Sequence, residues 1–162
     1  AAIQIAKSIG CVVYAGSGSD EKLKRLEALG ADYGVNTSNN EEFHRTIRGM
    51  TDGDGVDVVV NYTGGDTWVR SLKTLKHGGR LLTCGATIGF DPPTDIRYIW
   101  RKEMDIRGSD GWRRSDLVSL INAVRQGVIR PIIDKVLPLE ETAEGHRLLE
   151  EREVFGKVII QP

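Results

Sequence analysis

Hydrophobic runs alternate with amphipathic stretches along most of the chain. The run Val56–Tyr62 is apolar on both pleat faces, as a strand covered by helices on both sides must be. A helical stretch, Asp66–Lys76, separates it from a second apolar run, Leu81–Cys84, and glycine turns lie between the segments. Two strands joined by a helix form a right-handed unit and must run parallel. The pattern therefore predicts neighbouring parallel strands in this part of the chain.

The same alternation extends over the rest of the sequence. Further strands or extended segments are predicted at Cys11–Ala15, Asp32–Val35, Met104–Arg107, Pro131–Val136 and Gly156–Ile160, and further helices at Ala1–Ile9, Asp20–Leu29, Glu41–Met50, Ile96–Lys102, Ser115–Gln126 and Glu140–Arg152. A regular strand–helix order of this kind predicts an α/β fold, with a parallel sheet covered by helices on both faces.

The first predicted helix has an unusual setting. Ala1–Ile9 is apolar almost all round, so we expect it to be packed on a sheet. No capping residue stands before it, which would leave the first amides of a buried helix without partners. We therefore expect this chain to be a piece of a longer protein.

Composition narrows the class of protein. The chain has 162 residues, of which 40% are hydrophobic and 28% charged, an ordinary content for one domain with a core. A formal net charge of −1 gives no electrostatic argument for nucleic acid or an anionic membrane. No apolar run reaches the roughly 20 residues that span a bilayer. Cys11 and Cys84 lie in predicted strands, so we expect buried, reduced cysteines in a cytoplasmic protein.

Candidate chemistry is expected where the strands end. Open parallel sheets bind ligands beyond the carboxyl ends of their strands, and the ends here are Asn61–Gly65 and Gly85–Gly89. Both are turns of small residues that allow close approach to the backbone. His44, His77 and His146 have no Cys or Glu partner at metal-ligand spacing, and no nucleophile motif is present. We therefore predict no catalytic residue and no metal ligand within this chain.

Three segments in this order resemble the cofactor half of the medium-chain dehydrogenase/reductase family: AAIQIAKSIGCVVYAGSGSDEKLKRLEALGADYGVN, DGVDVVVNYTGG and LKTLKHGGRLLTCGATIG. That family includes zinc-dependent alcohol dehydrogenases and quinone-reductase-like proteins, and the resemblance covers nearly the whole chain. It implies a Rossmann-like, doubly wound parallel sheet that lacks its first strand. Residues 1–128 would be a partial dinucleotide-binding domain, and residues 129–162 would return to a catalytic domain outside this chain, where any zinc would be held.

The choice of dinucleotide depends on the end of the Cys11–Ala15 strand. An acidic residue there would bind the adenosine ribose and repel a 2′-phosphate, but Ala15–Ser19 contains none. Ser17 and Ser19 offer hydroxyls and Lys22 offers a positive charge, which favours NADP, with NAD left possible. The alternative is that the serines cap the next helix and that Lys22 is a solvated surface residue.

The resemblance also implies contacts with the nicotinamide half of the cofactor. Asn61, Tyr62 and Thr63 would meet the ribose hydroxyls. Two loops, Gly85-Ala86-Thr87 and Gly108-Ser109-Asp110, resemble those whose backbone groups hold the carboxamide. The alternative for the first region is structural: Gly64 and Gly65 make the turn, and Asp66 or Thr67 caps the following helix.

The resemblance implies an NAD(P)-dependent oxidoreductase that acts on a small carbonyl, alcohol or quinone, with this chain inactive alone. Without a first strand, the inner edges of Cys11–Ala15 and Val56–Tyr62 would be open, so we also expect a homo-oligomer. Two alternatives remain at this point. LKHGGRLL is also typical of the glycine turn before a strand in class-I-like methyltransferases, and the chain could instead be a non-catalytic binding or oligomerisation domain.

Overall fold

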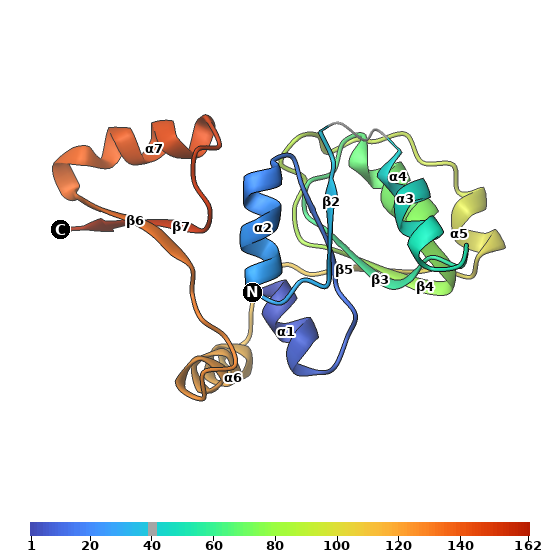
Figure 1. Cartoon of the computed structure of the whole chain (residues 1–162), viewed down its shortest axis with the longest axis horizontal. Helices are drawn as coiled ribbons and strands as arrows, with labels where there is room; N and C mark the ends of the chain where they lie inside the picture. Colours follow the sequence, from blue (N-terminus) through green and yellow to red (C-terminus); the bar gives the residue numbers. More distant parts are fainter. Residues whose placement is uncertain (39–41) are drawn as a thin grey trace.

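The computed structural model describes residues 1–38 and 42–162 (Figure 1). Asn39, Asn40 and Glu41 lie outside the described residues, and with them the first residue of the helix predicted at Glu41–Met50. In chain order the elements are α1 (Ala2–Ser8), β1 (Tyr14–Ser17), α2 (Asp20–Ala28), β2 (Tyr33–Asn36), α3 (Phe43–Met50), β3 (Val56–Asn61), α4 (Thr67–Thr74), β4 (Leu75–Thr83), α5 (Arg97–Arg101), β5 (Asp105–Gly108), α6 (Arg114–Arg125), β6 (Ile133–Pro138), the 3-10 helix η1 (Leu139–Glu141), α7 (Thr142–Glu150) and β7 (Lys157–Gln161).

The strands form three parallel sheets. β1 pairs with β2, β4 lies between β3 and β5, and β6 pairs with β7. Helix α2 lies on one side of the β1–β2 pair and α3 on the other (Figure 1). The predicted element order and the α/β class with parallel, doubly wound strands are confirmed, and the architecture is Rossmann-like.

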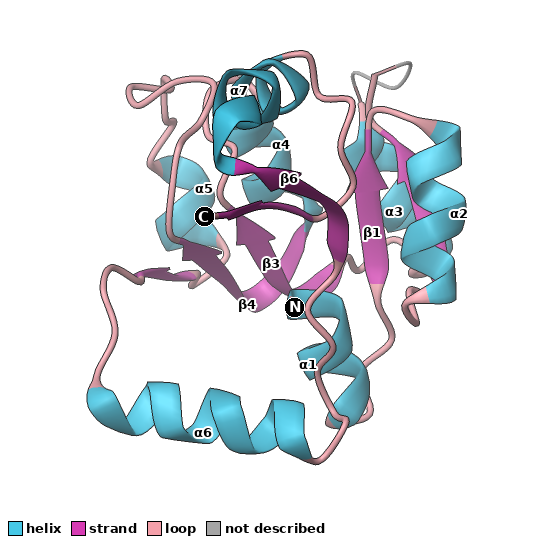
Figure 2. Ribbon diagram, turned by 90° about the vertical axis from the view of Figure 1, so that its left-hand side faces the viewer, coloured by secondary structure: helices cyan, strands magenta, loops and turns pink. Residues whose placement is uncertain are grey.

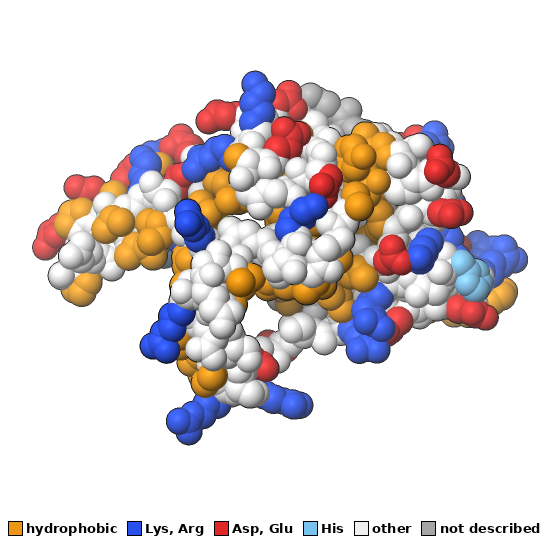
Figure 3. All heavy atoms as spheres, turned by 60° about the horizontal axis from the view of Figure 1, so that its bottom comes forward, with side chains coloured by type: hydrophobic (Ala, Val, Ile, Leu, Met, Phe, Trp, Pro, Cys, Tyr) orange, Lys and Arg blue, Asp and Glu red, His pale blue; other side chains and the backbone are white. Residues whose placement is uncertain are grey.

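The strands β1–β5 do not form one continuous sheet, because β1 and β3 are not paired among the described strands. No ladder joins these two strands in the described part of the chain, so each has an open inner edge. Val58 and Val60 are 48% and 45% exposed. The prediction that this strand is covered on both faces is therefore wrong, because helices pack on only one of its faces. Figure 3 shows hydrophobic side chains exposed between α6 and the rest of the molecule.

Helix α1 also differs from the sequence prediction. None of its residues is buried, and Ile5 is 45% exposed. The prediction of a helix packed closely on a sheet is wrong for the same reason: the strand pair that it would cover is interrupted. Lys7 instead forms an ion pair with Asp32 at 2.8 Å, which ties α1 to the start of β2.

Both cysteines are exposed, which corrects the prediction of buried core thiols. β1 begins three residues later than predicted, because the Asp32 carboxylate accepts a hydrogen bond from the Val13 amide and the ladder starts after it. Cys11 therefore precedes the strand. β4 begins earlier than predicted, directly after α4, and ends at Thr83, which leaves Cys84 in the turn.

The core lies between β3–β5 and the helices α4 and α5. Leu72, Leu75 and Leu81 are fully buried, Met104 is nearly so, and Trp68 packs against them. This cluster fixes β4 at the centre of its sheet. The carboxyl ends of β3, β4 and β5 are thereby held at one edge.

Residues 133–161 form a separate small unit, called here the C-terminal unit, in which β6, η1, α7 and β7 pack on one another. Leu148 is its most buried side chain, at 2% exposed. The chain reaches it through α6, which has no buried residue and stands away from the sheet (Figure 2). The side-chain amide of Gln4 pairs with the backbone N–H and carbonyl of Arg130, just before the unit begins.

Candidate functional site

The register of the β3–β4–β5 sheet aligns the segments predicted to bind the nicotinamide half of the cofactor. Asn61 at the end of β3 lies opposite Thr83 of β4, and Thr83 lies opposite Gly108 of β5. Residues 62–65, 84–89 and 109–110 follow these three positions directly. The structure therefore brings all the predicted nicotinamide-side residues to one edge of the sheet.

Asn61 organises the turn after β3. It is 5% exposed, and its amide nitrogen donates to the hydroxyls of Thr67 and Ser71 at 3.0 and 2.8 Å. Its carbonyl oxygen accepts from the backbone amides of Thr63 and Gly64, both at 2.9 Å. All four polar contacts point into the protein. The Asn61 side chain thus orders the turn that carries the neighbouring candidates, and sequence reasoning missed its partners Thr67 and Ser71 because nothing in their spacing indicates them.

The turns after β3 and β4 are joined by backbone hydrogen bonds. The amide of Ile88 donates to the Thr63 carbonyl at 2.9 Å, and the amide of Gly65 donates to Gly89 at 3.0 Å. Gly64 has a φ of +71°, and a Cβ there would lie 2.4 Å from the Gly89 oxygen. The glycines are therefore required by the close approach of two turns. This supports the structural alternative for Gly64 and Gly65, although the capping role suggested for Asp66 is absent, since its side chain forms no cap hydrogen bond.

The groups that face solvent at this edge are mostly backbone groups of small residues. Tyr62 is 57% exposed and Thr63 is half-buried. The other exposed candidates are Gly85, Thr87, Gly108, Ser109 and Asp110, with Ala86 half-buried. Ser109 is fixed by a hydrogen bond from its amide to the Thr83 carbonyl at 2.8 Å.

The second group of candidates lies at the end of β1 and the start of α2. Ser19 is the N-cap of α2 and accepts a hydrogen bond from the Lys22 amide, which confirms the predicted alternative of a capping serine. The Ser19 amide contacts the Ser17 hydroxyl at 3.4 Å. Asp20, the first residue of α2, accepts a hydrogen bond from the Asn36 side chain at the end of β2.

The Lys22 ammonium donates a hydrogen bond to the backbone carbonyl of Arg152, which is 130 residues away in the sequence. The position of Lys22 on α2 was predictable, but this partner was not. Lys22 is nonetheless only half-buried. One amine, two hydroxyls and the start of a helix are the donors that bind phosphate groups in proteins. The residues after β1 therefore fit a phosphate.

The residues described here do not fit a zinc ion. No group of three or more His, Cys, Asp or Glu side chains within them could hold a metal. His77 and His146 are exposed. His44 is buried, its Nδ1 has no hydrogen-bond partner among the described residues, and burial lowers the pKa of its imidazole. Among the described residues, no helix is long and apolar enough to cross a bilayer.

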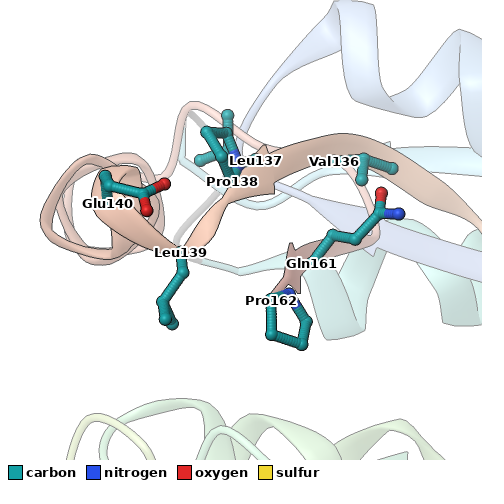
Figure 4. A pocket seen from close by; sticks show the side chains of 7 residues that line it. All are labelled: Val136, Leu137, Pro138, Leu139, Glu140, Gln161 and Pro162. Carbon is teal, nitrogen blue, oxygen red and sulfur yellow. The ribbon is translucent and has the colours of Figure 1, made fainter.

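A shallow hollow of about 440 Å³ lies in the C-terminal unit, between the ends of β6 and β7 (Figure 4). Leu137, Leu139 and Pro162 line it, with Glu140 as its one charged lining residue. It lies on the side of the unit away from α2 (Figure 1). The hollow is therefore separate from both groups of candidate residues.

Comparisons with known proteins agree on one family. A family model described as zinc-binding dehydrogenase matches residues 1–126. Acryloyl-coenzyme A reductase of Sulfurisphaera tokodaii is 31% identical over 165 residues, which cover 99% of this chain and 46% of the relative. 2-Haloacrylate reductase of a Burkholderia species is 29% identical over 171 residues, 97% of this chain and 50% of the relative.

Solved structures show the same fold. The crystal structure of an NAD-dependent alcohol dehydrogenase is similar to this chain with a TM-score of 0.92 and 41% identity, over 99% of this chain and 47% of that one. A mycobacterial quinone oxidoreductase is similar with a TM-score of 0.82 and 25% identity. The chain spans about half the length of the curated relatives it matches, 46% and 50% for the two reductases named above.

Proposed function

The chain belongs to the zinc-binding dehydrogenase family, within the medium-chain dehydrogenases and reductases, and from this we propose that the carboxyl edge of its sheet binds a nicotinamide dinucleotide for hydride transfer. The observation that carries the proposal is the register that places Asn61, Thr83 and Gly108 side by side. Ligands of open parallel sheets bind at such an edge. The family's relatives include NAD-dependent alcohol dehydrogenase and several reductases.

NADP is the proposed cofactor, with NAD as the competitor. Lys22 would contact a 2′-phosphate together with the hydroxyls of Ser17 and Ser19. The hydrogen bond from the Asn36 side chain to Asp20 supports this choice, because it directs the first carboxylate after β1 toward the end of β2. A carboxylate free to bind a ribose diol at the end of β1 would favour NAD instead.

The nicotinamide end would lie over the turns after β3, β4 and β5. Tyr62 and Thr63 would contact the ribose, and the backbone groups of residues 85–87 and 108–110 would hold the carboxamide. When bound, the nicotinamide exchanges a hydride at its C4 with the substrate. The residues of this chain would bind and orient the cofactor, and the buried Asn61 side chain would hold the turn after β3 in place.

The proposed substrates are small carbonyl compounds, alcohols or quinones, in the cytoplasm. The names of two relatives add conjugated alkenes, as acryloyl-coenzyme A and 2-haloacrylate, to the compounds worth testing. The described residues include no group of three or more side chains that could hold a metal, and we propose that any zinc is held in the catalytic domain.

A chimera tests the proposal directly. The half of the Sulfurisphaera reductase that this chain does not match would be fused to residues 1–162, and NADPH oxidation would be followed with acryloyl-coenzyme A, quinones and aldehydes. We expect turnover by the chimera, and none by residues 1–162 alone, for which calorimetry should find weak or no NADP(H) binding. A folded chimera that binds no dinucleotide would contradict the proposed function, and micromolar NADPH binding by the chain alone would contradict its proposed inactivity.

We also propose that the chain self-associates through its open strand edges. Val58 and Val60 of β3 are exposed, the edge of β3 that faces β1 is open among the described strands, and open apolar edges recruit other strands. The outer edge strand β5 offers a second pairing surface. Light scattering at several protein concentrations should show a dimer or larger species. A compact monomer at every concentration, with cooperative thermal unfolding, would contradict this expectation.

A further inference from the structure

Three contacts join α2 to the C-terminal unit. The guanidinium of Arg25 forms an ion pair with Asp134 of β6 at 3.0 Å. The same guanidinium lies 4.1 Å from the centroid of the Phe155 ring, so it is stacked on an aromatic face as well as paired with a carboxylate. One turn earlier on α2, Lys22 donates to the Arg152 carbonyl. Positions 22 and 25 share a face of the helix, and that face meets the unit.

The Arg25 contacts are more than a loose surface ion pair. The Asp134 side chain is only 15% exposed. The hydrogen bond from Arg25, followed by that from the Phe155 amide, holds the pKa of Asp134 below its usual range. A planar guanidinium with an acceptor at its edge and an aromatic ring on its face is held in one orientation. Arg25 thus fixes residues 134 and 155 against α2.

Arg152 lies just past the end of α7. Its φ of 57° is the left-handed conformation in which many helices end, and its amide bonds back to Leu149. The free backbone carbonyls at the C-terminal end of α7 form the negative pole of the helix dipole, which attracts a cation. Lys22, by contrast, lies in the first turn of its own helix, where the dipole disfavours a cation. The C-terminal unit therefore stabilises the Lys22 ammonium.

From this geometry we infer that Arg25 is a positioning residue that couples the C-terminal unit to phosphate recognition. While Arg25 holds Asp134 and Phe155, the Lys22 ammonium donates a hydrogen bond to the Arg152 carbonyl. The carbonyl thereby competes with a phosphate for this ammonium. When the unit moves away, Lys22 is released. A phosphate that binds Lys22 must in turn weaken the docking of the unit, since coupling between two sites is reciprocal. The inference rests on the proposed contact between Lys22 and a 2′-phosphate.

Two variants and one matched control test the inference in the 162-residue chain. Arg25→Ala removes the contact from α2, and Asp134→Ala removes it from the C-terminal unit. Lys24→Ala is the control, because Lys24 is exposed on the same helix and forms no hydrogen bond or ion pair with the described residues. Hydrogen exchange of residues 152–157 measures the docking of the unit. NMR titration with adenosine 2′,5′-bisphosphate and adenosine 5′-monophosphate measures phosphate recognition at weak affinity.

We expect both Ala variants, but not the control, to speed exchange at residues 152–157. We also expect both to raise the affinity for the bisphosphate about fivefold relative to the monophosphate, the low end of typical coupling between sites. Adding the bisphosphate to the unmodified chain should speed exchange in the same segment. Unchanged exchange, or faster exchange with an unchanged affinity ratio, would overturn the coupling and leave the proposed function intact. Equal affinity for the two ligands in every variant would overturn the NADP preference itself.

Discussion

The two sides of the candidate cofactor edge are built in different ways. On the nicotinamide side, the turns after β3 and β4 are held by backbone hydrogen bonds and by Asn61, which is 5% exposed. On the adenosine side, the side chains of Ser17, Ser19 and Lys22 lie around the start of α2, and Lys22 is bound to a distant part of the chain. The nicotinamide side is thus held in shape by closely packed backbone. The adenosine side depends on side chains whose hydrogen-bond partners can be exchanged.

This difference predicts which substitutions affect the fold and which affect cofactor binding. Close backbone contact leaves no room for an added atom, so substitutions on the nicotinamide side should affect folding first. Side-chain donors near solvent can be exchanged with little effect on the fold. Substitutions on the adenosine side should therefore affect cofactor choice first.

The largest effect is expected at Gly64. Gly64→Ala would place a Cβ 2.4 Å from the Gly89 oxygen in a left-handed conformation. We expect the free energy of unfolding to fall by about 3 kcal/mol or more, from left-handed strain of about 1–2 kcal/mol and the loss of the Gly65–Gly89 hydrogen bond. Gly78→Ala is the matched control, because its φ of +70° is the same and nothing lies within 4 Å. It should cost about 1 kcal/mol. Equal urea midpoints for the two variants would show that close approach is not the cause.

Asn61 comes next. Asn61→Ala would remove the acceptor of the Thr63 and Gly64 backbone amides, whereas the hydroxyls of Thr67 and Ser71 would keep their own hydrogen bonds to backbone carbonyls. Leaving buried polar groups unpaired should lower the free energy of unfolding by about 2–3 kcal/mol. Asn122→Ala, on the exposed face of α6, is the control and should change it by less than about 0.5 kcal/mol. Urea unfolding measures both, and a loss at Asn61 as small as at Asn122 would contradict its role in the turn.

Lys22 and Ser17 should alter cofactor choice without altering the fold. In the chimera, Lys22→Ala and Ser17→Ala should weaken NADPH much more than NADH. A charge-assisted contact with a phosphate is worth about 1.5–3 kcal/mol, roughly a tenfold to hundredfold change in affinity. Lys24→Ala serves as the control. An equal loss for both cofactors, or an original preference for NADH, would show that Lys22 is a surface lysine only.

The smallest expected effect is the pH dependence of the adenosine side. The pKa of Asp134 is lowered, so its ion pair with Arg25 contributes stability above the ordinary aspartate pKa of about 3.9 and loses it as the pH falls through the lowered folded-state pKa. The Phe155 amide resonance should therefore change only at pH values below that range, and Asp134→Asn should abolish the change. The Asn61 amide resonance should show no such transition, because its partners do not ionise. A transition at the ordinary pKa would contradict a formed ion pair.

By itself, the sequence determined the features that depend on local chemistry. Strand and helix periods gave the element order, and the glycine turns located the carboxyl edge. Even the alternative role of Ser19, as a helix cap, was visible from its place before Asp20. These features were predictable because a residue and its near neighbours fix them.

Only the tertiary structure decided how these pieces meet. The exposure of Val58 and Val60 depends on which strands pair, and β1 and β3 do not. The inward direction of Asn61 depends on two hydroxyls of α4, and the engagement of Lys22 depends on a carbonyl 130 residues away. The hydrophobic pattern of a strand indicates that its side chains are stabilised by burial, but it does not indicate which segments of the chain cover them. Contacts between distant segments decide that, and local periodicity carries no information about them.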